Sequence, residues 1–314
     1  MTTTILWTVF GVIVTAMMAL DLGVFHRKAH DVTVREALTW TAVWVALGLG
    51  FGLFAWLERG RNTAAEYFAC YLTEYALSVD NIFVFLVIFT YFGVPSASRH
   101  RVLFWGILGA LAMRAVFLVS GVALIQKFHW TVYVLGAILI FTGIKLFRQG
   151  DEEIRPERNF VLRAAKRFLP VTEGYEGHAF FVQRGGRRFA TPLFLTLLVV
   201  ESTDVMFAVD SVPAALSMSK DLLVVYTSNV FAILGLRSLF FAVSGLLQYL
   251  HYLKYGLSAI LMFVGIKMML PEDRKIPIEI ALSIVGGILL VAVLASVIRT
   301  KRQGGAGGEG GGGT

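Results

Sequence analysis

The sequence predicts an all-α, polytopic membrane protein, and three observations lead to that class. The chain of 314 residues is 57% hydrophobic and 16% charged, whereas a soluble domain carries about 25% charged residues. Its mean hydropathy is +0.72. Nine apolar stretches are long enough for a hydrocarbon core of about 30 Å, which needs roughly 20 helical residues. Because lipid offers the backbone no hydrogen-bonding partner, such continuous stretches are expected to be helices and not barrel strands.

The nine predicted spans form a single transmembrane domain over residues 1–303. The first span has no basic leader or cleavage pattern before it, so we expect it to be retained as a helix. A long loop, 149–191, separates the fifth span from the sixth. The spans cover 5–25, 37–57, 66–93, 102–125, 130–148, 192–216, 221–248, 252–270 and 277–298.

Two segments are expected to lie outside the bundle. Within the charged loop, 158–169 fits a short amphipathic helix on the membrane and 178–190 fits a hairpin around Gly185 and Gly186. A plain solvated linker is the alternative for the loop. The tail, 304–314, is glycine-rich and is expected to be flexible.

The distribution of basic residues predicts the orientation. If the N-terminus is outside, 18 of the 28 Lys and Arg residues fall in cytoplasmic segments and six on the opposite side. The positive-inside rule therefore favours an outside N-terminus and a cytoplasmic C-terminus in a bacterial inner membrane. The net charge of +7 then faces anionic lipid headgroups and gives no indication of nucleic-acid binding.

An internal repeat relates the two halves of the chain. Residues 133–145 align with 255–267 at nine of 13 positions, and Arg114 and Arg237 occupy corresponding places upstream. Repeat 1 covers about 66–148 and repeat 2 about 192–270, with three predicted helices each. An odd number of spans inverts the second copy, which is the plan of many secondary transporters with a site at the repeat interface.

Two acidic clusters lie within these repeats, and both are embedded in apolar sequence. A carboxylate at the bilayer centre costs about 2.5 to 3.5 kcal/mol, so these acids must face a polar interior. Five acids against Arg114 and Arg237 leave an excess of negative charge that a divalent cation, protonation, or both would relieve. A static network that only joins helices is the alternative. The predicted metal ligands are Glu74, Asp80, Asn81, Glu201, Asp204, Asp210 and Ser211, with Arg114 and Arg237 as charge partners.

Helical geometry separates the acids of each cluster. Glu74 shares a face with Ser78 and Asn81, whereas Asp80 and Asp210 point about a third of a turn away from the shared faces. Either the helices are broken, for which Pro213 is a candidate, or these two aspartates pair with other groups such as the arginines.

The donor types favour a hard cation. Carboxylate, amide and hydroxyl oxygens suit Mg, Ca or Mn better than softer ions. Asn229 is either an additional ligand or an interhelical hydrogen-bonding residue. The sequence has no enzyme motif and no motif for a prosthetic group, so we expect neither. The single cysteine, Cys70, excludes an internal disulfide framework and is expected to be an inert packing residue.

These motifs resemble the TerC family of integral membrane proteins, including its Alx-type members. The resemblance rests on the segment Asp21-Leu-Gly-Val-Phe-His26-Arg27, the two acidic motifs and the two Gly-Ile-Lys endings, and it covers about 5–298. It implies metal-ion homeostasis, with manganese efflux first, in a family named for tellurite resistance. The predicted function is therefore a divalent-cation transporter, with proton coupling as an option. The alternative is a non-transporting scaffold that assists assembly or stress responses; membrane lipid is an expected partner, and a homo-oligomer is compatible with the sequence.

Overall fold

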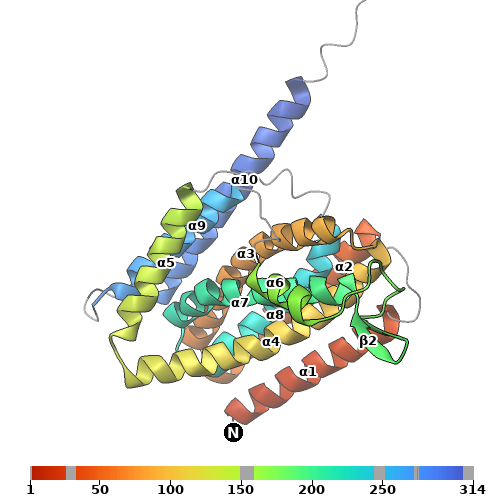
Figure 1. Cartoon of the computed structure of the whole chain (residues 1–314). Helices are drawn as coiled ribbons and strands as arrows, with labels where there is room; N and C mark the ends of the chain where they lie inside the picture. Colours follow the sequence, from red (N-terminus) through yellow and green to blue (C-terminus); the bar gives the residue numbers. More distant parts are fainter. Residues whose placement is uncertain are drawn as a thin grey trace, which may run out of the picture.

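The computed structural model describes residues 2–25, 33–148, 159–243, 252–271, 274 and 276–306, and most of them are helical (Figure 1). A helix occupies the described part of each of the nine predicted ranges. The long helices are α1 (Thr2–Phe25), α2 (Val34–Arg59), α3 (Arg61–Phe92), α4 (Ser96–Lys127), α5 (Thr131–Arg148), α7 (Pro192–Met218), α8 (Leu222–Val243), α9 (Leu253–Met269) and α10 (Ile278–Ala306).

Seven helices in the described part of the chain are long and apolar enough to cross a membrane. They are α2, α3, α4, α5, α7, α8 and α10. In α1 the apolar stretch is shorter, Thr3–Ala19, and α9 has only 17 residues. The structure therefore supports an all-α membrane protein, while the number of spans stays a prediction.

The helices extend further than the apolar stretches predicted. α3 begins at Arg61 instead of 66, α4 at Ser96 instead of 102, and α10 continues to Ala306, past the predicted start of the tail at 304. Hydropathy identifies only the apolar part of a helix, whereas the helix itself extends to the residue that terminates its hydrogen-bonding pattern. Gly93 is such a stop, because its φ of +63° is left-handed and its N–H bonds the carbonyls of Phe89 and Thr90.

Four helices, α3, α4, α7 and α8, form the centre of the molecule, and α2 packs against α3 and α8. α3 and α7 are antiparallel: Cys70 Sγ lies 3.6 Å from the Ala215 carbonyl oxygen, and further along Ser219 donates to the Glu66 carboxylate. Two apolar clusters fill this centre. One includes Tyr71 and neighbours toward one end of α3, and the other begins at Ile82 toward the other end.

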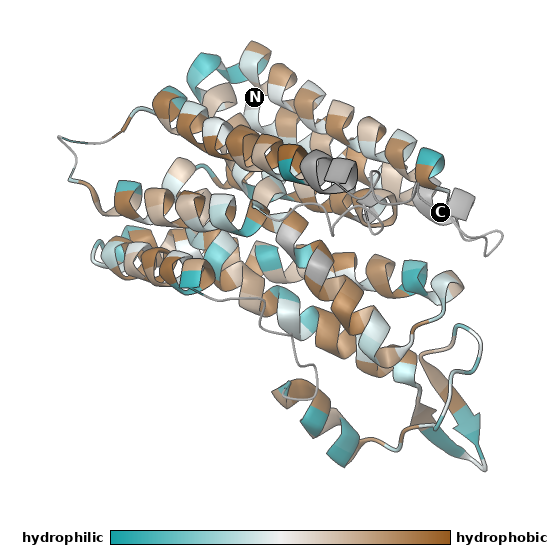
Figure 2. Cartoon of the chain, turned by 90° about the horizontal axis from the view of Figure 1, so that it is seen from above, coloured by the Kyte–Doolittle hydropathy of each residue, from teal (hydrophilic) through white to brown (hydrophobic). Residues whose placement is uncertain are grey.

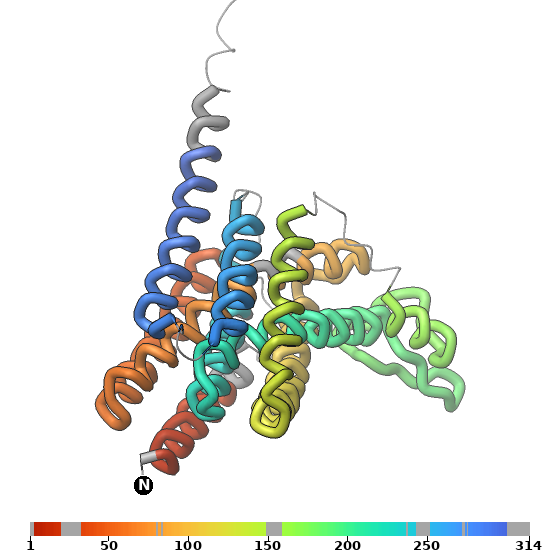
Figure 3. Tube along the Cα trace, turned by 90° about the vertical axis from the view of Figure 1, so that its left-hand side faces the viewer, coloured from red at the N-terminus to blue at the C-terminus, as the bar shows by residue number. Residues whose placement is uncertain are grey.

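A second group of helices consists of α5, α9 and α10 (Figure 1). α5 contacts α4 and α7, α9 contacts α7, and α10 packs against α3 and α9. α5 and α9 lie side by side in the second view as well (Figure 3). Their backbones are very close: a Cβ added to Gly265 would lie 2.7 Å from the Gly136 carbonyl oxygen. Ser258 Oγ also donates to the Gly143 carbonyl oxygen at 2.6 Å. The two backbones therefore approach closely at these glycines, and the side chains of Ile140, Met262 and Met269 pack beside them.

The long loop has structure of its own. Residues Phe160–Phe168 form α6, and β1 (Phe181–Arg184) pairs antiparallel with β2 (Arg187–Ala190). Gly185 and Gly186 make the turn with φ of +56° and +78°. Of the two interpretations of this loop, the structure shows the short helix and the hairpin and not a plain linker, whereas 149–158 lies outside the described residues. Hydrophilic residues gather on this helix and hairpin, while the long helices are mostly hydrophobic (Figure 2).

The acidic segments are regular helix throughout. α3 and α7 continue without interruption through both acidic motifs, and α7 contains Pro213 in its interior. A broken helix is therefore excluded for the described backbone. Asp210, which points away from the other acids of α7, bonds a residue of α5 instead.

Candidate functional site: a buried acidic cluster

The centre of the site is an ion pair between α3 and α4. Arg114 Nη1 lies 2.5 Å from Glu74 Oε1, and only 5% and 1% of the two side chains is exposed. Separating two such charges inside a protein is costly, because either one alone would be a buried, unpaired ion. The pair therefore ties α3 to α4 in the interior of the bundle.

Asn229 of α8 closes this pair into a network. Its Oδ1 accepts a hydrogen bond from Arg114 Nη1 at 2.5 Å, and its Nδ2 donates to Glu74 Oε2 at 2.9 Å. Ser78, one turn along α3, donates to Glu74 Oε1 at 3.1 Å. Both oxygens of Glu74 are thus occupied by protein donors. Of the two interpretations of Asn229, the structure shows the interhelical hydrogen bonds.

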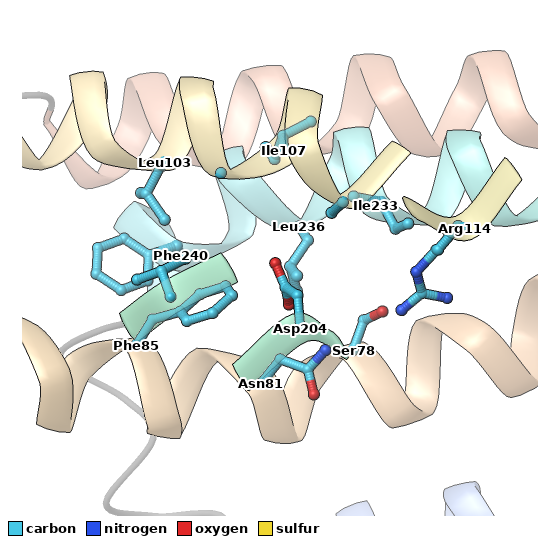
Figure 4. Close-up of a pocket in the computed structure, with 13 residues that line it drawn as sticks. Ser78, Asn81, Phe85, Leu103, Ile107, Arg114, Asp204, Ile233, Leu236 and Phe240 are labelled. Carbon is cyan, nitrogen blue, oxygen red and sulfur yellow. The ribbon is translucent and has the colours of Figure 1, made fainter. Parts of the chain in front are cut away.

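A small cavity adjoins the network (Figure 4). Its volume is about 20 Å³, which is enough for one water molecule or a small ion without its hydration shell. The polar ends of Ser78, Asn81, Asp204 and Arg114 turn toward one another around it, and Phe85 is among the residues at the apolar end. The cavity is also lined by Leu103, Gly106, Ile107, Ala110, Val200, Ile233, Leu236 and Phe240.

Asp204 brings α7 into the site. Its carboxylate interacts electrostatically with both Arg114 and Glu74. Because Asp204 and Asn81 line the same cavity, one predicted ligand from each acidic motif meets there. The structure thus joins the two clusters that the sequence placed in separate halves of the chain.

Glu201 lies one helical turn before Asp204 and interacts with it electrostatically. Its carboxylate fits against Gly109 of α4, since a Cβ added to Gly109 would overlap the Glu201 oxygens. The contact of Gly109 with Glu201 could not be predicted from the sequence, because a glycine within an apolar helix does not indicate which neighbouring helix packs against it.

Asp210 faces a different part of the molecule. Its Oδ1 accepts a hydrogen bond from Thr142 Oγ1 of α5 at 2.9 Å, and Lys145 adds positive charge nearby. The described hydrogen-bonding partner of Asp210 is therefore a threonine of α5, which agrees with the prediction that this aspartate pairs with another group in an unbroken helix. The next residue, Ser211, is only 3% exposed, and no described group bonds its hydroxyl.

The remaining predicted residues cannot be placed. The side chains of Asp80 and Arg237 lie outside the described residues. Within the described part of the chain, no group of three or more His, Cys, Asp or Glu side chains could hold a metal ion. Oxygen ligands for a cation at the cavity would come from Asp204, Asn81 and Ser78, with Glu74 engaged by Arg114.

Comparison of the sequence with known proteins finds one matching family and several similar membrane proteins. Residues 59–304 match the family described as "Integral membrane protein TerC family". An uncharacterised membrane protein of Myxococcus xanthus is 50% identical over 296 residues, covering 94% of this chain and 93% of the relative. An uncharacterised membrane protein of Rickettsia bellii is 39% identical over 293 residues, covering 93% and 97%.

A further relative, from Escherichia coli O6:H1, is 41% identical over 301 residues, covering 93% of this chain and 94% of that protein. Its name describes it as a candidate membrane-bound redox modulator, Alx. No solved structure matches the chain.

Proposed function

The chain belongs to the TerC family of integral membrane proteins, and from this premise we propose that it transports divalent metal cations, with manganese efflux across the bacterial inner membrane as the first candidate. The observation that carries this proposal is the buried cavity in which Asp204, Asn81 and Ser78 adjoin the Glu74–Arg114 pair. Ionisable residues in the interior of a membrane bundle usually mark an ion pathway. No enzymatic activity and no prosthetic group are part of the proposal.

The charge balance of the site favours a cation. Arg114 compensates Glu74, whereas Asp204 and Glu201 have no cation bonded to them among the described ion pairs. A cation entering the cavity would find net negative charge, and an oxyanion such as tellurite would be repelled. Proton uptake by the acids is a second way to balance the charge, so exchange of metal for protons fits the same site.

The choice of ion rests on donor chemistry and on the family. The cavity offers carboxylate, amide and hydroxyl oxygens, the ligands that Mg, Ca and Mn prefer. Manganese is the first choice because the family resemblance implies manganese homeostasis. The ion is treated as a substrate, which must be able to leave again.

The helix contacts support two inverted repeats, with α3, α4 and α5 in one and α7, α8 and α9 in the other. If α3, α4 and α5 correspond to α7, α8 and α9 in that order, the contact between α3 and α8 has a counterpart between α7 and α4. Both contacts are present. In the sequence alignment Gly136 is equivalent to Ser258, and Gly265 is equivalent to Gly143. The close approach of Gly136 to Gly265 therefore has a counterpart in the contact between Ser258 and Gly143, which is also present. In this proposal the site lies between the two repeats, as alternating access would require.

The nine-span topology with an outside N-terminus is part of the proposal. The ends of α3 and α4 near Gly93 lie on the same side as α6 and the hairpin, because Tyr175 Oη donates to the Phe92 carbonyl oxygen at 2.7 Å. This is the side that carries most of the basic residues, so we assign it to the cytoplasm.

A redox role, as in the names of some relatives, has little support from the described chemistry. The only cysteine, Cys70, is fully buried against Ala215, and a thiol needs access to exchange with a partner. The other alternative is a scaffold that transports nothing. Flux measurements distinguish it from a transporter.

The experiment is manganese flux into proteoliposomes that contain the purified chain or its variants. Asp204→Asn is expected to lower the flux by about tenfold or more, as for a lost metal ligand. Asp80→Asn is expected to do the same and to reduce manganese tolerance of cells. Asp221→Asn is the matched control. Asp221 directly precedes α8 and pairs with Arg59 at the end of α2, and neither residue lines the cavity. Absence of flux in the unaltered chain, together with tolerance that survives Asp80→Asn, contradicts transport.

A second variant tests the role of Glu201 without removing its charge. Gly109→Ala would displace the Glu201 carboxylate from α4, and the flexible end of that side chain can move at little cost to folding. We expect Gly109→Ala to reproduce part of the flux loss of Glu201→Gln while the unfolding temperature stays unchanged. Flux equal to that of the unaltered chain in both variants would remove Glu201 from the pathway.

A further inference from the structure

The short helix α6 (Phe160–Phe168) has three different faces, and only one of them packs on the protein. Leu162 and Ala165 are 1% and 8% exposed and belong to the apolar cluster that includes Phe85. Because these two residues are three apart, they form one stripe along the helix. The other long side chains of α6 are exposed on the surface of the protein.

A second face of α6 is apolar and exposed. Phe160 is 76% exposed, Phe168 is 78% exposed, and Val161 between them is 37% exposed. At about 100° per residue these three side chains fall within one third of the helix circumference. Two phenylalanines this exposed are unfavourable in water, since each ring has a large apolar area to bury.

The third face of α6 is basic. Arg163, Lys166 and Arg167 are all exposed, and the helix contains no acidic residue. The Arg167 guanidinium lies 6.0 Å from the centre of the Phe168 ring, so the basic and aromatic faces adjoin. A helix with separate aromatic and basic faces is the pattern of segments that lie in the headgroup region of a membrane.

The position of α6 agrees with such a location. Asn159 caps the helix by accepting from the Leu162 N–H at 3.1 Å and donates to Ser202 Oγ of α7 at 2.8 Å. The loop that follows α6 reaches the end of α4, where Ser98 Oγ lies 2.9 Å from His178 Nδ1. Ser202 lies ten residues inside α7, whereas Val171, three residues after α6, pairs with Ala190 just before α7 begins. α6 therefore lies along the first three turns of α7, and its C-terminal end, with Arg167 and Phe168, is nearest the end of the bundle, where the membrane surface would be.

We propose that α6 is a binding site for anionic phospholipid. The phenylalanine face lies among acyl chains, and the basic face binds the phosphate groups of phosphatidylglycerol or a similar lipid. The two adjoining faces select a lipid over free phosphate, because phosphate alone would leave the rings exposed. This inference does not depend on transport by the chain.

The first experiment measures where the rings lie. Spin labels are placed on Phe160→Cys or Phe168→Cys in a Cys70→Ala background, and the protein is reconstituted in phosphatidylcholine vesicles with about one fifth phosphatidylglycerol. We expect both labels to be reached more readily by oxygen than by a water-soluble nickel chelate, with a label at Arg187→Cys on the hairpin as the aqueous reference. Labels at both positions that match this reference would overturn the proposal.

The second experiment measures lipid affinity by native mass spectrometry of the full chain titrated with phosphatidylglycerol. Each basic residue near an anionic surface contributes about a fivefold change in affinity. Arg163→Gln, Lys166→Gln and Arg167→Gln together should therefore weaken binding by about a hundredfold. The matched control removes three charges from the hairpin, through Arg184→Gln, Arg187→Gln and Arg188→Gln. Equal losses in the two triple variants would overturn α6 as the site, as would no loss in the α6 variant.

Discussion

At the scale of single residues, Arg114 has the most specific role in the structure. Its guanidinium bonds Glu74 and Asn229 at 2.5 Å each and lines the cavity together with Asp204. A positive side chain therefore lies beside the place where a substrate cation would bind. Cation entry and the Arg114–Glu74 bond are expected to compete for the same carboxylate.

A double-mutant cycle tests how strongly the buried pair is coupled. Glu74→Gln and Arg114→Gln are each expected to lower the free energy of unfolding by about 3 kcal/mol, because each leaves a buried charge without its partner. The double variant should lose less than the two singles combined, with a coupling energy of about 1 to 3 kcal/mol. Denaturant unfolding of the purified protein in detergent measures both quantities.

The chain provides a matched control for this cycle. Arg59 Nη1 lies 2.6 Å from Asp221 Oδ2, nearly the same separation, but the two side chains are 27% and 34% exposed. Solvent screens such a pair, so its coupling should be about 0 to 1 kcal/mol. Equal coupling in the two cycles would mean that burial does not determine the strength of the Glu74–Arg114 pair.

At the scale of helices, the contact between α5 and α9 distinguishes this bundle from one held by large side chains. Gly136 and Gly143 face Gly265 and Ser258, so the two backbones approach closely, with larger side chains such as Met262 and Met269 packed beside the glycines. Small residues at such positions are how helices associate in lipid, where the hydrophobic effect gives no drive for association. The pair is expected to behave as one unit.

Gly265→Ala is the sharpest test of that contact. The new methyl group would meet the Gly136 carbonyl oxygen at 2.7 Å, and backbone cannot move aside as a flexible side chain can. We expect a loss of about 1 to 3 kcal/mol in stability, as for overpacking. Gly287→Ala in α10 is the control, since no atom lies within 4 Å of its added Cβ. A thermal unfolding series in detergent compares the two, and equal midpoints would show that the approach carries no packing constraint.

The sequence predicted the positions of helices better than their mutual contacts. Apolar runs and the Gly185-Gly186 turn are local signals, so the helices and the hairpin could be located, although α3, α4 and α10 extend beyond the predicted ranges. The partner of Asp210 could not be predicted, because Thr142 is 68 residues away and helical phase gives a direction without a neighbour. Asn229 could be recognised as polar and in phase with Arg237, but its bonds to Glu74 and Arg114 required the three helices in place.

At the scale of the whole molecule, the site lies between two apolar clusters of the central helices. One cluster contains Tyr71 and Ile107, and the other contains Phe85 and Phe240, two residues that also line the cavity. Apolar side chains therefore flank the polar network along the bundle. Separation of either apolar cluster would widen the route to the cavity from that side, as alternating access would require.

The orientation of the molecule is open to direct measurement. Lys220 lies between α7 and α8 and is exposed at one end of the bundle, whereas Arg187 is exposed on the hairpin at the other. In a Cys70→Ala background, a membrane-impermeant maleimide added to intact cells should label Lys220→Cys and leave Arg187→Cys unlabelled. The reverse pattern would place the N-terminus in the cytoplasm and contradict the orientation predicted from basic residues.

The salt bridge inside the acidic cluster also affects how the protein survives without metal. Many metal-binding proteins unfold when a chelator removes the ion, because only the ion neutralises their ligands. Here Arg114 already neutralises Glu74, and Asn229 and Ser78 complete its hydrogen bonds. The fold should therefore tolerate metal starvation and EDTA.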